Sequence, residues 1–394
     1  MTAAADRVHA ALATAARPVC AYVYDTRKLR ERADALRAAL PPDARLLYAV
    51  KANGHPAVVA ALAACLDGLE VASGGELTLA VAARARRIVF GGPAKTDTEL
   101  AAAVEAGALV NVESVHELRR LALAARAAGR RVPVGLRVNR TGTALPGSHR
   151  MTGEPTPFGI DDSALPGAAA LAASLPELDL VGFHLHTVSN NVDAAAHAAF
   201  VADAIGWATG AARRFGVPLR YLNVGGGFGI SYTGAPGGPA DLDLRVLRSG
   251  LADAVRALPD GTELVFEPGR LLAADAGVYA AEVLELKRTH GRWFAVLRGG
   301  THHFRLPAAW GYSHPFAVLP SDDWRYPFDR PEVRDVEVDA VGELCTPRDV
   351  LTRGQRVDRL RIGDVLLFAR TGAYGWDISH HEFLRHAYPQ MVVL

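Results

Sequence analysis

An apolar run that ends in a lysine decides the interpretation of the chain: Leu46-Leu47-Tyr48-Ala49-Val50-Lys51-Ala52-Asn53. It predicts a buried strand over residues 46–51, followed by a turn at Asn53-Gly54 and a helix after Pro56. Only four lysines occur in the 394 residues: Lys28, Lys51, Lys95 and Lys287. Arginine could form a surface ion pair at position 51 equally well, but only the lysine amine can lose its proton and attack a carbonyl group. The alternative is a strand-end lysine that reaches the solvent.

The region before Arg270 alternates short apolar runs with alanine-rich helical stretches. Most runs carry Val, Ile, Leu or Phe without strict alternation, as strands buried on both faces do. Eight strands are expected, at residues 46–51, 68–72, 87–90, 109–112, 133–138, 180–186, 221–224 and 264–267. Helices are expected between them, among others at 56–65, 75–84, 96–106, 114–128, 194–215 and 243–258. Eight such units favour an α/β fold of the TIM-type (β/α)8 barrel class over an open, doubly wound sheet.

The pattern changes after Arg270. Strand-like runs joined by Pro- and Gly-rich connections predict a second domain that is mostly β, a β-barrel or sandwich. These runs lie at residues 278–287, 293–297, 336–341 and 364–368, and the strand-like stretch 19–24 is expected to join them. The expected domains are therefore residues 28–272 for the barrel and residues 1–27 with 273–394 for the β domain.

Composition excludes several classes of function. The formal net charge of +1 gives no reason to expect a nucleic-acid partner. Cys20, Cys65 and Cys345 are widely spaced, which indicates neither a disulfide framework nor a metal site. The N-terminal stretch lacks the pattern of a signal peptide, and no apolar run approaches the roughly 18 residues that span a bilayer. A cytoplasmic protein without a membrane partner is expected.

Polar and reactive residues follow the predicted strands. In a barrel, chemistry takes place where strands end and βα loops begin. The residues at these positions are Lys51, Ser73, Gly91, Arg137, Asn139, His184, His186, Gly225, Gly226, Gly227 and Glu267. The Gly- and Pro-rich loop at residues 140–157 also leaves a strand end and is a candidate lid.

Three of these motifs have a structural alternative. Gly225–Gly227 could direct backbone N–H groups at a phosphate, although a glycine cluster is more often only a turn. Glu267 follows an apolar run, so it is expected to face the barrel mouth, where a buried carboxylate needs a cationic partner. The alternative is a solvated charge in a loop. His184 and His186 lie on one strand face without a third ligand, so we expect an imidazole stacked on a planar ring or a satisfied polar residue, and no metal site.

Together the motifs resemble the fold-type III pyridoxal-phosphate-dependent decarboxylases, the family of diaminopimelate and ornithine decarboxylases, over essentially the whole chain. The matching stretches include Tyr48–Asn53, Glu70–Leu77 and Gly372–Gly375. The resemblance implies pyridoxal 5'-phosphate bound covalently to Lys51, with Glu267 at the ring nitrogen. It further implies His186 stacked on the cofactor ring and phosphate contacts from Ser189, Gly225, Gly226, Gly227 and Arg270.

The resemblance also implies a homodimer with shared active sites. Cys345 and Tyr374 match residues of the second domain that reach the partner subunit's site, where Tyr374 contacts the cofactor. Cys345 is then the candidate acid that protonates the carbanion after carbon dioxide leaves. Cys345 could also be only a small buried apolar residue. Glu267 argues against a racemase, because in the related racemases an arginine faces the ring nitrogen.

Departures from the family bear on the substrate. Thr346 stands where ornithine and diaminopimelate decarboxylases carry an acidic residue, and Val188 replaces a glycine. The segment 298–311 carries Arg298, His302, His303 and Arg305, which suit a substrate with extra carboxylates. Together with residues 151–159 and 374–381, this segment resembles a subgroup that decarboxylates citryl-type amino-acid conjugates in siderophore biosynthesis.

The expected substrate contacts are therefore Arg137, His302, Arg305, Thr346 and Asp349. The alternatives are a diaminopimelate or other diamino-acid decarboxylase, and a non-catalytic cofactor-binding or regulatory homologue.

Overall fold

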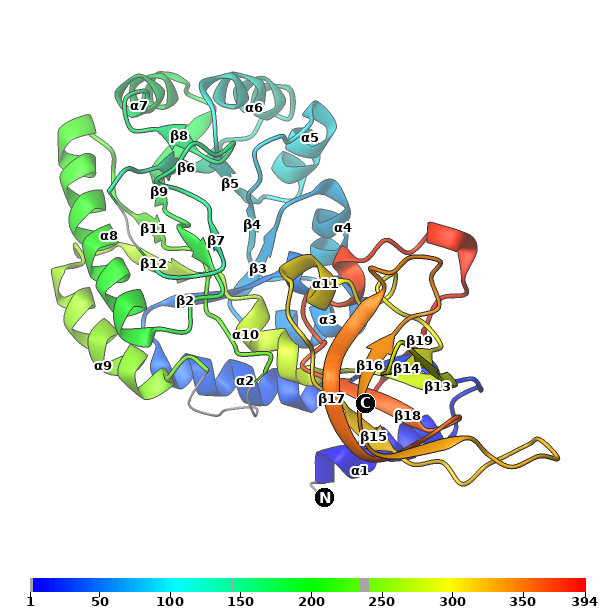
Figure 1. Ribbon diagram of the computed structural model, residues 1–394. Coiled ribbons are helices and arrows are strands. Elements are labelled where there is room, and N and C mark those ends of the chain that lie inside the picture. The colour runs from blue at the N-terminus through cyan, green and yellow to red at the C-terminus, as the bar shows by residue number, and fades with distance from the viewer. Residues whose placement is uncertain (1–2, 143–144, 234–240) are drawn as a thin grey trace. The chain divides into compact units, whose positions relative to one another are not determined.

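The computed structural model describes residues 3–142, 145–233 and 241–394. They form two compact units (Figure 1). The barrel unit holds the described residues of Arg30–Ser231 and Gly237–Leu272. The sheet unit holds those of Met1–Leu29, Tyr232–Pro236 and Ala273–Leu394. Among the described residues, no helix combines the length and the apolar composition that crossing a membrane requires.

Eight parallel strands close into a ring in the barrel unit, which confirms the predicted fold class. In ring order they are β2 (Arg45–Ala49), β3 (Gly68–Val71), β4 (Ile88–Phe90), β5 (Leu109–Val112), β6 (Val132–Asn139), β9 (Leu178–His184), β11 (Tyr221–Asn223) and β12 (Glu263–Phe266). The pairing of β12 with β2 closes the ring. A short strand, β8 (Ile160–Asp161), extends β6, while β7 (His149–Arg150) pairs with β10 (Val188–Ser189).

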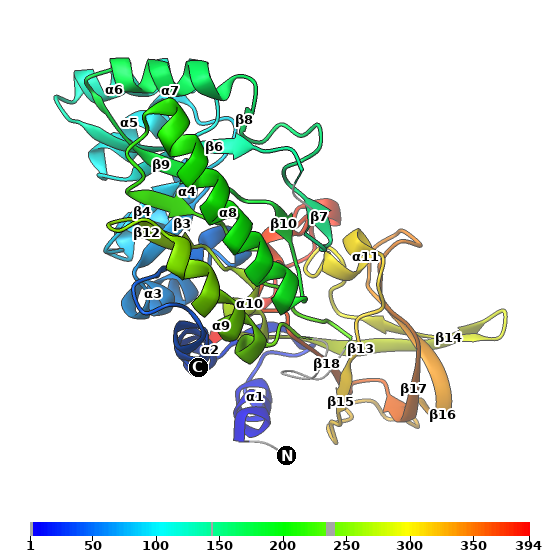
Figure 2. The same ribbon diagram turned by 90° about the vertical axis from the view of Figure 1, so that its left-hand side faces the viewer.

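Helices surround this ring (Figures 1 and 2). They are α3 (Pro56–Cys65), α4 (Gly74–Ala82), α5 (Asp97–Glu105), α6 (Val115–Ala127), α7 (Leu165–Ser174), α8 (Ala194–Phe215) and α9 (Leu244–Ala254), with α2 (Thr26–Ala39) before them and the short α10 (Arg270–Ala273) after them. Side-chain caps fix several of their starts: Ser73, Thr96 and Ser114 each accept a backbone N–H of the first turn. These caps fix the βα loops that precede α4, α5 and α6.

The sheet unit contains one mixed sheet of eight strands. The order along its main path is β15 (Ala317–Leu319), β18 (Val365–Ala369), β13 (Gly277–Thr289), β14 (Arg292–Leu297), β16 (Glu332–Val341) and β17 (Val350–Arg361). The strand β1 (Cys20–Tyr24) pairs with β13 and with β19 (Gln390–Val393). The prediction that 19–24 adds a strand to the second sheet is therefore confirmed. The helices of this unit are α1 (Ala3–Ala13) and α11 (Leu306–Trp310).

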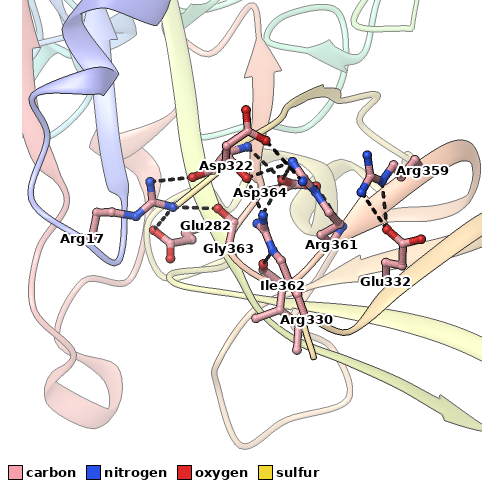
Figure 3. A network of polar contacts seen from close by, with 11 residues as sticks. Arg17, Glu282, Asp322, Arg330, Glu332, Arg359, Arg361, Ile362, Gly363 and Asp364 are labelled. Carbon is pink, nitrogen blue, oxygen red and sulfur yellow. Dashed lines mark hydrogen bonds and ion pairs between the residues drawn. The ribbon is translucent and has the colours of Figure 1, made fainter. Parts of the chain in front are cut away.

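Arginines and carboxylates from distant segments pair in the sheet unit (Figure 3). Arg361 lies 3.0 Å from Asp364 and 3.4 Å from Asp322, and Arg330 lies 3.2 Å from Asp364. Arg359 pairs with Glu332 at 2.9 Å. Each of these arginines therefore has a carboxylate partner.

Candidate active site

The predicted residues of the barrel unit lie at the carboxyl ends of its strands. Lys51 is in a 3-10 turn, Val50–Ala52, directly after β2. His184 ends β9, Gly225–Gly227 follow β11, and Glu267 follows β12. Because the strands are parallel, these ends share one rim of the barrel. Arg137 near the end of β6, His186 and Ser189 after β9, and Arg270 at the start of α10 complete the set.

Lys51 forms an ion pair with Glu70. Its Nζ lies 2.7 Å from the Glu70 carboxylate, which β3 holds buried, while the lysine side chain is 43% exposed. The carboxylate thus fixes an amine that can still be approached from outside. The role of Glu70 was missed in the sequence, although a carboxylate within the apolar run Gly68–Val71 was a usable signal.

Glu267 is buried in a polar cluster. Asn223 donates a hydrogen bond to its carboxylate, and His184 Nε2 lies 3.6 Å from its Oε2. Burial, followed by the charge of Glu70, raises the pKa of Glu267 to about 8. Burial, followed by the charge of Arg137, lowers the pKa of His184 well below its ordinary value. A buried acid without a full counter-charge suits a cationic ring nitrogen.

The glycine turn packs closely against its neighbours. A Cβ added at Gly225 would lie 2.3 Å from Nδ1 of His186, and one at Gly226 would lie 2.3 Å from the Glu267 carbonyl oxygen. At Gly227 it would lie 2.5 Å from the Val188 carbonyl oxygen, and φ is +86°. No larger residue fits, so the turn presents bare backbone, the form in which a loop can wrap a phosphate group.

Arg137 already has a partner. Its Nη1 donates to Glu113 at 2.7 Å, and its guanidinium lies 4.8 Å from the centre of the Phe158 ring. Glu113 in turn accepts the backbone N–H of Gly159 at 2.9 Å, so the pair fixes the chain just after the candidate lid segment at residues 140–157. Residues 143–144 of that segment lie outside the described residues. The contact of Arg137 with substrate stays a prediction.

In the sheet unit, Cys345 is exposed in the loop between β16 and β17. Asp349 closes this loop: its carboxylate accepts the backbone N–H of Thr301 at 2.6 Å and of Leu344 at 2.8 Å. Asp349 is buried, so it braces the loop that carries Cys345 and Thr346. Tyr374 is half-buried in the same unit, in the left-handed conformation at φ +54°.

The cations at 298–305 lie in different surroundings, and their contacts with substrate stay predictions. Arg298 pairs with Glu343, which therefore neutralises it. His302 is fully buried with Nε2 3.6 Å from Glu343, and burial lowers the pKa of His303 to about 2. Arg305 lines a cavity with a volume of about 790 Å³. Thr346 lines it too, whereas Arg348, Arg353 and His380 in its wall were not identified from the sequence.

Comparisons with known proteins agree with this geometry. The family described as "Pyridoxal-dependent decarboxylase, pyridoxal binding domain" matches residues 26–274. A Staphylococcus aureus protein named 2-[(L-alanin-3-ylcarbamoyl)methyl]-2-hydroxybutanedioate decarboxylase is 37% identical, over 96% of this chain and 94% of its own. Diaminopimelate decarboxylase of Aquifex aeolicus is 31% identical, over 94% and 86%. The crystal structure of Helicobacter pylori diaminopimelate decarboxylase with L-lysine has the same fold, with a TM-score of 0.86 at 23% identity, over 98% and 94%.

The barrel residues fit the cofactor of that family. The Lys51 amine can be approached for a covalent bond, and the tight glycine turn offers backbone N–H groups to a phosphate. Glu267 offers a buried carboxylate to a protonated ring nitrogen, and both ring nitrogens of the adjacent His184 lack a hydrogen-bond partner among the described residues. The chain belongs to the pyridoxal-dependent decarboxylases and is a carboxy-lyase that uses pyridoxal 5'-phosphate.

Proposed function

We propose that the enzyme removes the α-carboxylate of a citryl-type amino-acid conjugate in siderophore or other secondary-metabolite biosynthesis. The 37% identical relative carries the proposal, because its name describes alanine joined through an amide to a hydroxybutanedioate. Such a substrate has two carboxylates besides the one on the α-carbon. Thr346, in place of an acidic residue, removes the charge that would repel them.

The residues of the barrel would perform separate tasks. When bound, the cofactor supplies an electron sink for the bond that breaks. Lys51 Nζ would hold the cofactor covalently, and Glu70 would keep that nitrogen in place. Glu267 would hold a proton at the ring nitrogen, while Asn223 fixes its carboxylate. His186 would orient the ring by stacking on it.

The sheet unit would complete the site of a second copy. In this homodimer, placed in the cytoplasm, Cys345 would donate a proton from Sγ to the α-carbon after carbon dioxide leaves, and Tyr374 would contact the cofactor. The exposure of Cys345 within its own unit supports this role, since a thiol buried there could not reach a partner.

Diaminopimelate decarboxylase is the second candidate, because several curated relatives carry that name at 29–32% identity. Carbon dioxide release by the purified enzyme from citryl-diaminopropionate, meso-diaminopimelate, ornithine and lysine distinguishes the two. We expect the largest kcat/KM for the citryl conjugate. A larger value for any free diamino acid would contradict the proposal.

A further inference from the structure

A cationic cavity lies in the sheet unit beside the Cys345 loop. Three segments form its walls: residues 305–313 around α11, the loop 346–350, and the start of β17. With about 790 Å³ it is large enough for a small organic molecule. Its charged and ionisable lining residues are Arg305, Arg348, Arg353 and His380, and no carboxylate is among its lining residues.

The three guanidinium groups carry unbalanced charge. None forms an ion pair with a described residue, and all three side chains are exposed. Other arginines of the unit differ: Arg330, Arg359 and Arg361 each have a carboxylate partner (Figure 3). Burial, followed by the positive charge of Arg305, lowers the pKa of His380. A cluster of like charges in one hollow is stabilised by an anion.

Backbone contacts hold the charged residues in position. The Arg353 N–H donates to Ser313 Oγ at 2.8 Å, and that hydroxyl donates back to the Arg353 carbonyl at 3.2 Å. The Arg305 N–H donates to Ser379 Oγ at 3.0 Å, which ties it to the segment carrying His380. The main chain is therefore fixed while the guanidinium groups stay available to a ligand, which lowers the cost of ordering them.

The cavity lies next to Cys345, the candidate acid, because the following residue, Thr346, lines it. Thr346 lines it and is followed by Arg348, whose N–H donates to Thr346 Oγ1 at 3.3 Å. Asp349 fixes this loop from the opposite, buried side. An anionic group in the cavity therefore lies next to the segment that carries Cys345.

We propose that this cavity binds the dicarboxylate portion of the substrate, with Arg305, Arg348 and Arg353 as its carboxylate ligands. The planar guanidinium donates two parallel hydrogen bonds to a carboxylate, so three of them can bind two carboxylates at once. The inference rests on the proposed function, because it assigns the citryl end of the proposed conjugate to this cavity of the sheet unit.

Two measurements on the cofactor-loaded enzyme test the assignment. Calorimetry gives the Kd of citrate, the probe for the dicarboxylate portion, and steady-state kinetics give kcat and KM for citryl-diaminopropionate. Arg348→Ala and Arg353→Ala are each expected to raise this Kd and this KM at least about tenfold, because a hydrogen bond to a charged group is lost. Arg353→Lys should recover part of the loss. Arg356→Ala, exposed on the same strand and outside the cavity, is the matched control and should match the wild type.

The outcomes separate this inference from the proposed function. If the wild type decarboxylates the conjugate while both alanine variants keep its Kd and KM, the cavity assignment is wrong and the function stands. The wild type could instead fail to decarboxylate the conjugate, yet bind citrate more tightly than both alanine variants do. In that case the proposed function is wrong and the anion-binding site stands. Equal losses in Arg356→Ala would also overturn the assignment, because they would show a general effect of charge.

Discussion

The buried Glu267 should make the cofactor-free enzyme less stable as the pH rises. Its carboxyl has an ordinary pKa of 4.5 when the chain is unfolded, and burial beside Glu70 raises this to about 8 in the folded protein. Between these values the unfolded chain has released the proton that the folded protein keeps. The stabilisation is therefore complete below pH 4.5 and is lost as the pH rises to about 8, by about 1.4 kcal/mol per pH unit.

Between pH 5 and pH 8 the titration of Glu267 should lower the free energy of unfolding by roughly 3–4 kcal/mol. Urea unfolding of the cofactor-free protein at both pH values, followed by the helical circular dichroism signal, measures it. Comparison with Glu267→Gln isolates the group, since glutamine does not titrate. Exposed Glu105→Gln is the matched control and should follow the wild type.

Substitution of two charged neighbours, Glu70 and Lys51, should change the loss of stability between pH 5 and pH 8 in opposite directions. Glu70→Gln removes the charge that raises the pKa of Glu267, so the loss between pH 5 and pH 8 should shrink. Lys51→Met removes a charge that lowers it, so the loss should grow. An equal difference in the free energy of unfolding between the wild type and Glu267→Gln at both pH values would contradict the raised pKa of Glu267.

Three further predictions concern the cofactor, the dimer and the loop. Lys51→Arg keeps the charge and should keep the circular dichroism spectrum, but borohydride should no longer attach the cofactor covalently and turnover should be abolished; turnover at the wild-type rate would refute the role of Lys51. Mixing Lys51→Ala with Cys345→Ala after reversible dissociation should restore about a quarter of wild-type activity, because half of the dimers then hold one intact site of two; no recovery would place both residues in one chain's site. Asp349→Ala should lower the unfolding free energy by about 3 kcal/mol in urea titrations, because the N–H groups of Thr301 and Leu344 lose their buried acceptor; an unchanged midpoint would show that the brace is dispensable.

The barrel could be predicted because its strands are buried on both faces. Such strands appear in sequence as short apolar runs, and the predicted and observed bounds differ by two residues or fewer. The largest differences are at β2 and β9, whose predicted C-termini were Lys51 and His186. β2 ends at Ala49 because Val50–Ala52 form a 3-10 turn, and β9 ends at His184 before the chain turns into β10.

The sheet unit was less predictable. β17, Val350–Arg361, carries arginines along a partly exposed face and has no apolar run, so no strand was expected there. The strands β15 and β19 are three and four residues long, too short to give a periodic pattern.

The candidate site shows the same difference in predictability between the barrel unit and the sheet unit. In the barrel, topology alone brings the ends of parallel strands to one rim, so Lys51 and Glu267 could be assigned to it without any knowledge of their contacts. In the sheet unit, a cation's availability depends on whether a carboxylate distant in sequence neutralises it. Glu343 pairs with Arg298, 45 residues away, whereas Arg353 has no such partner among the described residues.

Counting arginines therefore could not identify the substrate contacts of an arginine-rich chain. The informative quantity is the charge left after pairing, and three arginines of the sheet unit that keep such charge, Arg305, Arg348 and Arg353, line one cavity. A substrate with one distal ammonium would be repelled there, whereas two distal carboxylates would be bound. Substrate choice in this enzyme thus depends on which arginines the fold leaves without a carboxylate, and reversing that balance with Arg348→Glu should weaken citrate binding more than Arg348→Ala does.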